Sequence, residues 1–429
     1  MKIVHVPFSW QPEVMGGTEV YVQELVCQLA KFAVQGVVVA PVSWGDRSDG
    51  MVRRVSPAVQ PSLAELYGGG DPRSASEFAA VLDLERPDVV HFHAMSPAVS
   101  VRWLSEARRR GIACVFTHHS ATFSCPRGTL LWRGIKPCSR GLRPLECASC
   151  VMQGRGVPSP LGKPAAMLTA LGAMLPGAPA MLQLWPLLRR RERATAAWLE
   201  GMDAVVALCD WSEALLREKM GVDARRLWKL RHAVNPMAGA NAREIMAGGV
   251  LRLGFFGRAD RSKGLALILE AMAMVPELPL ELEAHLLGTD DSISDALGSG
   301  NEPRLRCLPA IVPEGVMAAM ATFDVVLVPS QWMETGPLVL LEALGAGVPV
   351  LGSNLGGIAE WLRDDQDGWL LDWNDARVWA RAFESLCRQP ERIRRWQGNL
   401  RKPRCWSQLG GEMFELYQRI LQQRGGAPS

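Results

Sequence analysis

The sequence predicts an α/β protein made of two doubly wound domains, each with a parallel sheet. Short apolar runs of strand length alternate with segments of helical spacing, a pattern typical of βαβ units that share one parallel sheet. The chain has 429 residues, more than one ordinary hydrophobic core organises, so we expect two domains. A stretch rich in Ala and Gly, residues 238–249, is the predicted linker.

Composition and charge narrow the classes of function. With 48% hydrophobic and 21% charged residues, the chain is typical of a globular protein. The net charge is only +3, so no overall field favours nucleic acid, and we expect no nucleic-acid partner. The chain begins directly with a strand pattern and shows no signal-peptide pattern, which predicts a cytoplasmic protein with reduced thiols.

The first domain, residues 1–238, is predicted to alternate strands and helices. Helical spacing occurs, for example, in residues 75–84 and 98–110. Ligands collect at the carboxyl ends of the strands in such sheets, so residues that follow a strand are the first candidates for a binding site. The predicted strands are residues 2–7, 37–40, 89–92, 113–117 and 204–208.

Two glycines after the first strand are candidates for contact with a phosphate. Gly16 and Gly17 permit a close approach of the backbone, and the helix start behind them, at Thr18 and Glu19, suits an anion. The pattern is not Gly-x-Gly-x-x-Gly, which disfavours a dinucleotide site. Gly-Gly is also an ordinary turn, and that alternative stays open.

Four histidines end two of the predicted strands. His91 and His93 end the strand at residues 89–92, and His118 and His119 end the next one. For His91 and His118 we favour strand-end residues whose hydrogen bonds are satisfied by the backbone. For His93, such a structural role and contact with a ligand have equal weight.

Four cysteines lie in a loop, residues 120–155, that is rich in Pro, Gly and Arg and has little core-forming periodicity. Cys125, Cys138, Cys147 and Cys150 have the spacing Cys-x12-Cys-x8-Cys-x2-Cys. Thiolate ligation of a structural zinc ion or an iron–sulfur cluster would order such a loop. Only one close pair is present, so scattered structural thiols are the alternative.

An apolar helical segment, residues 164–198, follows the cysteines. No charged residue occurs at positions 164–188, but three prolines interrupt any helix of membrane-spanning length. We predict one helix at residues 165–175 and another that begins near Pro179 and runs into the basic residues 189–193. This pattern is typical of peripheral contact with the inner face of a membrane. A helical flap folded onto the domain or onto a second copy is the alternative.

The second domain, residues 249–404, repeats the alternation. Two cations, Arg258 and Lys263, flank the turn after its first strand. Fixed cations stabilise the charge of a departing diphosphate, and no metal motif accompanies them, so we expect no cofactor for catalysis. The predicted strands are residues 251–256, 282–288, 305–308, 325–328, 348–352 and 368–371.

Residues 329–360, PSQWMETGPLVLLEALGAGVPVLGSNLGGIAE, place two carboxylates near one helix start. Glu334 lies in the loop after a strand, and Pro337 is predicted at the first position of a helix that covers residues 338–344. Glu342 lies inside that helix. Carboxylates accept hydrogen bonds from hydroxyl groups, so the pair suits a ligand rich in hydroxyls.

The start of the same helix suits an anion. The N–H groups of Gly336, Leu338 and Val339 lie where a helix carries partial positive charge, which favours a phosphate or a sugar hydroxyl. An apolar helix with two surface glutamates would have the same carboxylate spacing, and it is the alternative for the pair alone.

The whole stretch at residues 329–360 resembles the nucleotide-sugar signature of glycosyltransferase family 4, a group of retaining enzymes with the GT-B fold. Residues 117–120 resemble the family's Thr-x-His-Asp stretch, and the Gly-Gly loop is similar to the one after its first strand. The four-cysteine loop resembles that of a subgroup. The family's Gly-Arg-x4-Lys-Gly segment is matched by Gly257, Arg258, Lys263 and Gly264.

The resemblance implies an architecture and a reaction. The architecture is two Rossmann-like doubly wound domains that face a central cleft, with a C-terminal helix, residues 405–424, that crosses back to the first domain. The reaction is transfer of a sugar, with retention, from a UDP- or GDP-type nucleotide-sugar to a glycan or lipid-linked acceptor in the synthesis of cell-surface polysaccharide.

The resemblance also implies roles for single residues. Arg258 and Lys263 contact the diphosphate, and Glu342 contacts the ribose. Glu334, on the donor sugar, and His119, near the reacting carbon, are the predicted catalytic residues. His93 is placed on the acceptor or sugar side. Backbone groups complete the predicted donor site at Gly16, Gly17, Gly336, Pro337 and Leu338.

Two departures from the family pattern keep other functions open. Ser120 stands where Asp is common, and Thr335, Gly336 and Pro337 follow Glu334 where many relatives have a Phe-Gly pair. Another GT-B enzyme, such as an epimerase or a phosphorylase, is one alternative. A non-catalytic, glycosyltransferase-like binding partner is the other.

Overall fold

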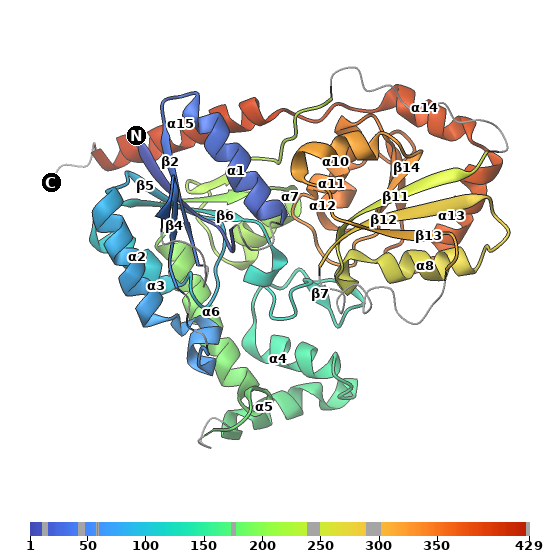
Figure 1. Ribbon diagram of the computed structural model, residues 1–429. Helices are drawn as coiled ribbons and strands as arrows, with labels where there is room; N and C mark the ends of the chain where they lie inside the picture. The colour runs from blue at the N-terminus through green and yellow to red at the C-terminus, as the bar shows by residue number, and fades with distance from the viewer. Residues whose placement is uncertain are drawn as a thin grey trace. The chain divides into compact units, whose positions relative to one another are not determined.

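A computed structural model of the chain describes residues 1–10, 16–41, 48–56, 58, 60–172, 177–237, 249–288 and 302–425 (Figure 1). It divides into two compact units, one made of Met1–Arg231 with Leu409–Ser429 and the other of His232–Gln408. The predicted linker, residues 238–249, lies outside the described residues except for its last position.

Unit 1 contains a sheet with the strand order β10-β9-β6-β5-β1-β2-β4-β3 among the described residues. All of its pairs are parallel except β3 with β4. The central strands are buried along nearly their whole length, which is why they read as apolar runs in the sequence. The strands are β1 (Lys2–Val6), β2 (Gln35–Ala40), β3 (Ser48–Asp49), β4 (Val52–Arg54), β5 (Val89–Phe92), β6 (Ala113–His118), β9 (Ala204–Ala207) and β10 (Leu227–Lys229).

Helices cover the sheet of unit 1. Asp71 caps α2 by accepting hydrogen bonds from the backbone of Arg73 and Ser74, with Pro at the start of the helix. The ring of Phe78 stacks on that of Trp103 with centroids 4.1 Å apart, which joins α2 to α3 in the core. The helices are α1 (Gly17–Ala30), α2 (Pro72–Glu85), α3 (Val101–Arg109), α4 (Pro144–Gln153), α5 (Gly162–Gly172), α6 (Leu184–Glu200), α7 (Asp210–Ala214) and α15 (Trp406–Gly425).

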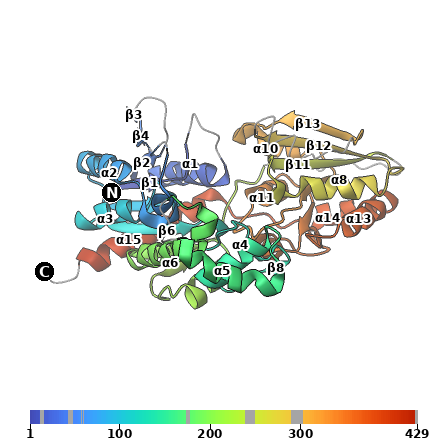
Figure 2. The ribbon, with the colours of Figure 1, turned by 90° about the horizontal axis from the view of Figure 1, so that it is seen from below.

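The four-cysteine loop has more secondary structure than the sequence predicted. A two-stranded antiparallel sheet forms from β7 (Leu131–Trp132) and β8 (Lys136–Pro137), and α4 carries two of the cysteines. The prediction of little periodicity was wrong for α4, because one face of this helix packs on α5 and α6 (Figure 2). The shared small core contains Ala148, Ala166, Leu184 and Leu188.

The apolar segment forms two helices, as predicted, and they begin at residues 162 and 184. The predicted end of the first helix, at residues 173–175, lies outside the described residues. No helix in the described part of the chain is both long and apolar enough to cross a membrane.

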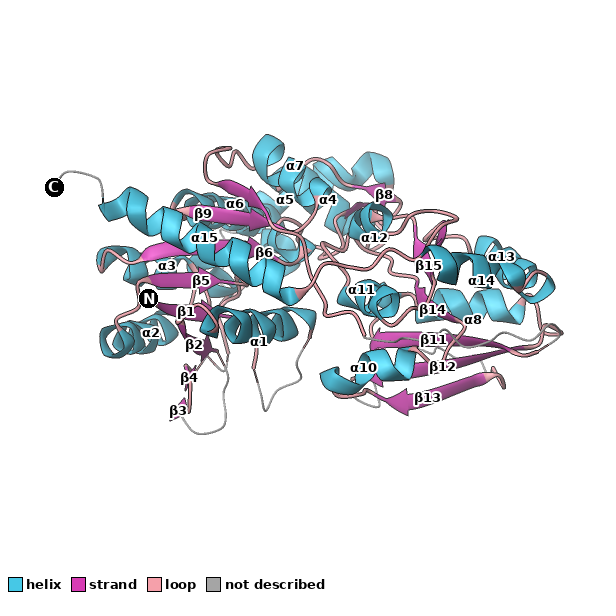
Figure 3. Ribbon diagram, turned by 90° about the horizontal axis from the view of Figure 1, so that it is seen from above, coloured by secondary structure: helices cyan, strands magenta, loops and turns pink. Residues whose placement is uncertain are grey.

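Unit 2 contains a fully parallel sheet in its described pairs, with the order β13-β12-β11-β14-β15-β16 (Figure 3). Its strands are β11 (Leu251–Arg258), β12 (Leu280–Leu287), β13 (Leu305–Pro309), β14 (Val325–Val328), β15 (Val350–Ser353) and β16 (Gly368–Leu371). Its helices are α8 (Leu265–Ala273), α10 (Pro313–Met320), α11 (Leu338–Gly345), α12 (Gly356–Trp361), α13 (Ala376–Arg388) and α14 (Glu391–Asn399).

The topology of unit 2 gathers three loops at one edge of the sheet. Strands β11, β14 and β15 are neighbours and parallel, so their carboxyl ends lie together. The loops that follow these strands carry Lys263, Glu334 and Gly356. The two parallel α/β units confirm the predicted fold class at the level of the sheets.

Candidate functional site

Lys263 and Glu334, predicted from separate motifs, form an ion pair in unit 2. The Lys263 Nζ lies 2.7 Å from Glu334 Oε1, and the hydroxyl of Ser330 donates to the same oxygen at 2.9 Å. Glu334 is only 5% exposed, and Lys263 also lies 5.4 Å from the centre of the Trp332 ring. A carboxylate held this way has a fixed orientation.

Gly264 makes the approach of the two loops possible. It adopts φ +81°, and a Cβ at this position would lie 2.0 Å from the carbonyl oxygen of Pro329. The backbone N–H of Gln331 also donates to the carbonyl of Ser262 at 2.6 Å. A side chain at residue 264 would therefore push apart the loops that carry Lys263 and Glu334.

Two further glycines, Gly356 and Gly357, contact the backbone of Glu334. The N–H of Gly357 donates to the carbonyl of Glu334 at 2.7 Å. Gly356 adopts φ +53°, and a Cβ there would lie 3.0 Å from the backbone nitrogen of Glu334. Gly356 and Gly357, near the end of the stretch at residues 329–360, thus position Glu334, which lies near its beginning. The sequence pattern did not reveal this role.

The helix after Glu334 begins at Leu338, as predicted, but Pro337 does not occupy its first helical position. Pro337 is the N-cap residue of α11, with extended backbone at ψ 112°, and is not the first helical residue. A Cβ on Gly336 would lie 2.3 Å from Cδ2 of His232, so this glycine packs directly on a buried histidine that the sequence analysis missed. Burial lowers the pKa of His232 to about 3, which keeps its ring neutral.

Arg258 and Glu342, the other charged residues of the predicted donor site, differ in environment. Arg258 ends β11 with a side chain that is 53% exposed, and its nearest ion pair, with Asp260, spans 3.9 Å. Burial raises the pKa of Glu342 to about 7. Near neutral pH, Glu342 therefore exists both as a carboxylate and as a carboxylic acid, which can accept from or donate to a hydroxyl.

The start of α1 in unit 1 is occupied by a side chain of the protein itself. Glu19 accepts a hydrogen bond from the backbone N–H of Gly16 at 2.9 Å and another from that of Ser9 at 3.3 Å. This is a capping arrangement, and burial raises the pKa of the Glu19 carboxyl. The N–H of Gly16 thus donates to Glu19 in this structure, and the contact of Gly16 and Gly17 with a donor phosphate stays a prediction. Gly17 is the first residue of the helix.

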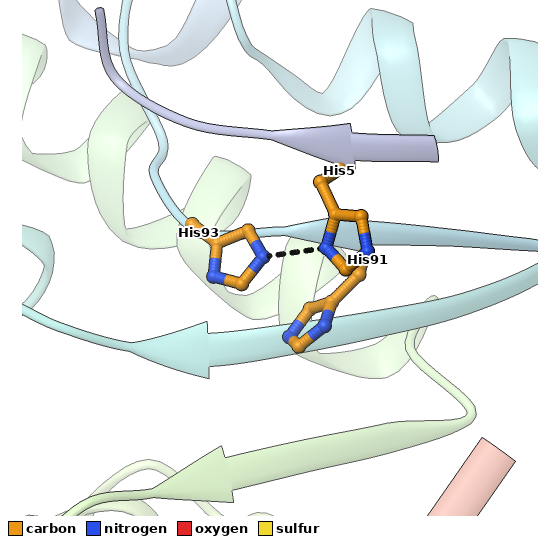
Figure 4. A group of neighbouring side chains, drawn as sticks. All are labelled: His5, His91 and His93. Carbon is orange, nitrogen blue, oxygen red and sulfur yellow. Dashed lines mark hydrogen bonds between the residues drawn. The ribbon is translucent and has the colours of Figure 1, made fainter. Parts of the chain in front are cut away.

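His5 from β1 forms a cluster with His91 and His93 (Figure 4), and His119 adjoins this cluster through His93. Nδ1 of His5 lies 3.3 Å from Nε2 of His93, and Nδ1 of His93 lies 3.1 Å from Nε2 of His119. His93 is 2% exposed and uses both ring nitrogens within the cluster. Its neighbour His119 is partly exposed, and the place of His93 on the acceptor or sugar side stays a prediction.

His91 is satisfied by side chains and not, as expected, by the backbone, whereas His118 has one side-chain partner and a buried Nε2 without a hydrogen-bond partner among the described residues. Nδ1 of His91 lies 2.6 Å from the hydroxyl of Tyr417, and its Nε2 lies 2.7 Å from that of Thr117. Nδ1 of His118 lies 2.6 Å from the hydroxyl of Ser212. The structural role that the sequence favoured for both histidines agrees with these contacts.

Two family models match the chain. The model for Glycosyltransferase Family 4 matches residues 15–151, and the model for Glycosyl transferases group 1 matches residues 247–402. Both models describe glycosyltransferases, and one matches part of each unit. The donor pair and the histidines at the ends of β5 and β6 lie inside the matched residues, whereas residues 152–246 lie outside both matches.

A curated relative is a phosphatidyl-myo-inositol mannosyltransferase of Mycobacterium leprae (strain TN). It is 27% identical over 240 residues, which are 52% of this chain and 61% of the relative. This chain therefore spans less than two thirds of the relative in the match.

Solved structures share the fold. Sucrose-phosphate synthase of Thermosynechococcus elongatus has a TM-score of 0.68 at 18% identity, covering 98% of this chain and 99% of that one. Anabaena HepE, in complex with UDP and glucose, has a TM-score of 0.64 at 14% identity, covering 98% and 100%. A Listeria monocytogenes protein described as a UDP-N-acetylglucosamine 2-epimerase has a TM-score of 0.55 at 12% identity, covering 100% and 98%. These likenesses confirm the GT-B fold, and because an epimerase shares it, the fold does not decide the reaction.

The four cysteines of unit 1 that the sequence analysis singled out line one small pocket. The backbone N–H of Arg133 donates to Sγ of Cys150 at 3.2 Å, and that of Arg143 donates to Sγ of Cys147 at 3.4 Å. Among the described residues, no three of the sulfur atoms lie within 4.8 Å of one another. The fold thus gathers Cys125, Cys138, Cys147 and Cys150 but does not present a closed tetrahedral metal site.

The segment outside both family models carries the most prominent exposed apolar group of unit 1. Met167, Leu168 and Leu171 project from α5, and Leu182 lies beside the end of that helix, where a Cβ on Gly172 would be 1.8 Å from the Leu182 carbonyl oxygen. We call these four residues the apolar patch. A pocket of about 450 Å³ nearby is lined by Arg189, Arg190 and Arg193 together with apolar residues.

Proposed function

We propose that the protein is a retaining glycosyltransferase that moves a sugar from a nucleoside-diphosphate donor to a glycan or lipid-linked acceptor. The ion pair between Lys263 and Glu334 carries this proposal, because two motifs 71 residues apart meet in the loops at the carboxyl edge of the unit 2 sheet. The family models support it, as does a relative named for mannosyl transfer to a phosphatidylinositol.

The donor half-site in unit 2 has a group for each part of a nucleotide-sugar. Arg258 and Lys263 supply cations for the diphosphate, whose charge grows as the bond to the sugar breaks. Glu334 accepts hydrogen bonds from sugar hydroxyls, and Glu342 contacts the ribose. The backbone at Gly336, Pro337 and Leu338 brings the start of α11 to the phosphate or the sugar.

His119 is the proposed catalytic residue of unit 1, where its ring stabilises the reacting sugar. Retention of configuration and the role of His119 rest on the family pattern. The choice between UDP and GDP, and a place in polysaccharide synthesis, are finer parts of the same proposal. HepE, a structural neighbour, is known in complex with UDP-glucose, which makes UDP-sugars the first donors to test.

The experiment is a panel of UDP-, GDP- and ADP-sugars, read by thermal shift and by release of the nucleotide. We expect one donor class to raise Tm, and Glu334→Gln and Lys263→Ala to abolish the shift. Glu384→Gln is the matched control, since Glu384 forms an ion pair with Arg388 on the surface of α13 in the same unit. A shift that survives both site variants contradicts the donor site. Isomerised donor without transfer favours the epimerase alternative.

We also propose that unit 1 contacts an anionic membrane surface through the apolar patch. Its side chains are exposed, with Leu168 at 65% and Leu171 at 60%, and the neighbouring arginines complement lipid phosphates. Leu184, which also lies in the predicted apolar segment, is buried at 2% and belongs to the small core of the segment.

Co-sedimentation with vesicles of phosphatidylcholine, with and without phosphatidylglycerol, tests the membrane proposal. We expect the double variant Leu168→Asp, Leu171→Asp to lose most of the binding to anionic vesicles. Leu84→Asp is the matched control, because Leu84 is an equally exposed leucine, at 71%, on α2. Equal partition of the wild type and the double variant rules the contact out.

A structural zinc ion or iron–sulfur cluster at the four cysteines remains a proposal. The shared pocket and the N–H groups that donate to two sulfur atoms support it, because such bonds commonly stabilise metal-bound thiolates. The wide spacing of the sulfur atoms means that the loop would have to contract around zinc, whose bonds to sulfur are about 2.3 Å long.

A further inference from the structure

His119 is the exposed end of a chain of three imidazole rings. His93 connects the other two, because one of its nitrogens lies 3.3 Å from Nδ1 of His5 and the other lies 3.1 Å from Nε2 of His119. His5 comes from β1, His93 follows β5 and His119 follows β6, and these are adjacent strands of one sheet. The three histidine rings are therefore positioned by neighbouring, buried strands of the unit 1 sheet.

Each inner ring of this chain is neutral, which makes its hydrogen bonds directional. Burial lowers the pKa of His5 to about 3, and burial also lowers the pKa of His93 well below its usual value. A neutral imidazole has one N–H donor and one acceptor nitrogen. One choice of direction therefore fixes the tautomers of all three rings.

His5, at the buried end of the row of histidines, decides the direction of these hydrogen bonds. Nε2 of His5 is buried and has no hydrogen-bond partner among the residues that the structure describes. Buried N–H groups without an acceptor are rarer in proteins than buried acceptors without a donor. The proton of His5 is therefore assigned to Nδ1, which donates to His93, and the Nδ1–H of His93 donates in turn to Nε2 of His119.

We propose that His5 and His93 are positioning residues that hold His119 as the tautomer with its proton on Nδ1. His119 then offers an N–H donor to a sugar hydroxyl or to the oxygen that leaves the reacting carbon, while Nε2 stays tied to the protein. This inference deepens the proposed function and rests on it only for the identity of the ligand. The tautomer itself is a property of unit 1.

His5, His91 and His93 are residues of a type that binds metal ions. The contacts that His91 makes argue against a metal site here. Ligand nitrogens of His5, His91 and His93 lie within 4.8 Å of one another. Both nitrogens of His91, however, are already hydrogen-bonded to the hydroxyls of Tyr417 and Thr117 at 2.6 and 2.7 Å. A metal would have to displace one of these bonds, whereas the hydrogen-bonded chain uses the contacts as they are.

Two substitutions at His93 separate the two ends of the chain. An asparagine amide nitrogen sits near the place of Nδ1 and keeps a donor toward His119, whereas a glutamine amide sits near Nε2 and reaches only His5. We expect kcat to fall about tenfold or more in His93→Gln and less than about threefold in His93→Asn. His118→Asn is the matched control, since His118 is equally buried but bonds to Ser212 outside the chain.

Side-chain nitrogen-15 NMR of histidine-labelled protein reads the tautomer without any substrate. We expect His119, assigned by its loss in His119→Asn, to carry its proton on Nδ1 in the wild type, in His93→Asn and in His118→Asn. In His93→Gln its signals should shift toward the Nε2–H form. Because this readout needs no turnover, it decides the inference even if every donor fails in the activity assay.

Three results would overturn the inference. A wild-type His119 protonated on Nε2 reverses the direction of the chain. Equal losses of kcat in His93→Asn and His93→Gln, with an unchanged His119 signal, reduce His93 to a structural residue. Stoichiometric metal in the purified protein that is lost in His5→Ala and retained in Cys147→Ser assigns the cluster to metal binding.

Discussion

The donor loops of unit 2 and the four-cysteine loop of unit 1 both carry candidate functional residues, but they are ordered in different ways. The donor loops leave neighbouring parallel strands, and glycines let them pack backbone to backbone around Glu334. The four-cysteine loop, residues 120–155, has a short 3-10 helix at Ala121–Phe123, a pair of two-residue strands and α4. The contrast teaches that loops at a sheet edge are fixed by close backbone contact, whereas a loop away from the sheet needs another source of order.

Among the changes that test this contrast, removal of metal from the four-cysteine loop should have the largest effect on stability. If the cysteines bind zinc, Cys147→Ser loses it by elemental analysis, and Tm falls by several degrees because metal binding contributes directly to folding. Cys27→Ser is the matched control, since Cys27 is an exposed cysteine on α1. A wild-type protein purified without chelator and free of stoichiometric metal shows that packing alone orders the loop.

The substitution Gly264→Ala should have the next largest effect on stability, and it tests the close packing of the donor loops. We expect a loss of about 3 kcal/mol in the free energy of unfolding, because both the positive φ and the contact with the Pro329 carbonyl oppose a Cβ. Thermal stabilisation by the donor should vanish as well. Denaturant unfolding and the thermal-shift assay measure the two effects.

Gly221→Ala provides the control for Gly264. Gly221 has φ +72°, but a Cβ there would meet nothing within 4 Å. It should cost only about 1 kcal/mol, the part that is due to backbone strain. If Gly264→Ala costs no more than Gly221→Ala, close packing does not order the donor loops.

The pH dependence of Glu342 is the smallest expected effect. Its pKa is about 7 in the folded protein and near 4.5 when unfolded, so the unfolded state loses its proton first as the pH rises. The wild type should therefore lose stability between about pH 4.5 and pH 7, and Glu342→Gln should remove about 2 kcal/mol of that loss. Chemical denaturation at pH 5 and pH 8 measures it, and parallel pH profiles for the two proteins contradict it.

The donor pair was predictable because its residues follow short apolar strands and belong to dense motifs. Strands β5, β14 and β16 were predicted with their exact bounds, and the fully buried parallel strand β14 reads as an unbroken apolar run. The capping pair of Gly16 and Glu19 was also readable as a capping-box spacing, yet the glycines suggested a phosphate site instead.

His5 and α4 were missed for a physical reason. His5 lies inside β1, where a single polar residue gives no periodic signal, and only the pairing of β1 with β5 brings it to His93. The apolar face of α4 is narrow, and it is buried only because α5 and α6, which lie later in the chain, pack on it. Contacts between segments far apart in sequence leave no local pattern.

The sequence by itself determined the two parallel α/β units, the resemblance to glycosyltransferases and the residues that meet at Lys263 and Glu334, because strand periodicity and dense motifs are local properties. The tertiary structure alone decided that Glu19 accepts from the start of α1, that Gly356 and Gly357 contact the backbone of Glu334, and that His93 lies buried in the core. These outcomes depend on burial and on contacts between distant segments, which set the direction of hydrogen bonds and the pKa of each group.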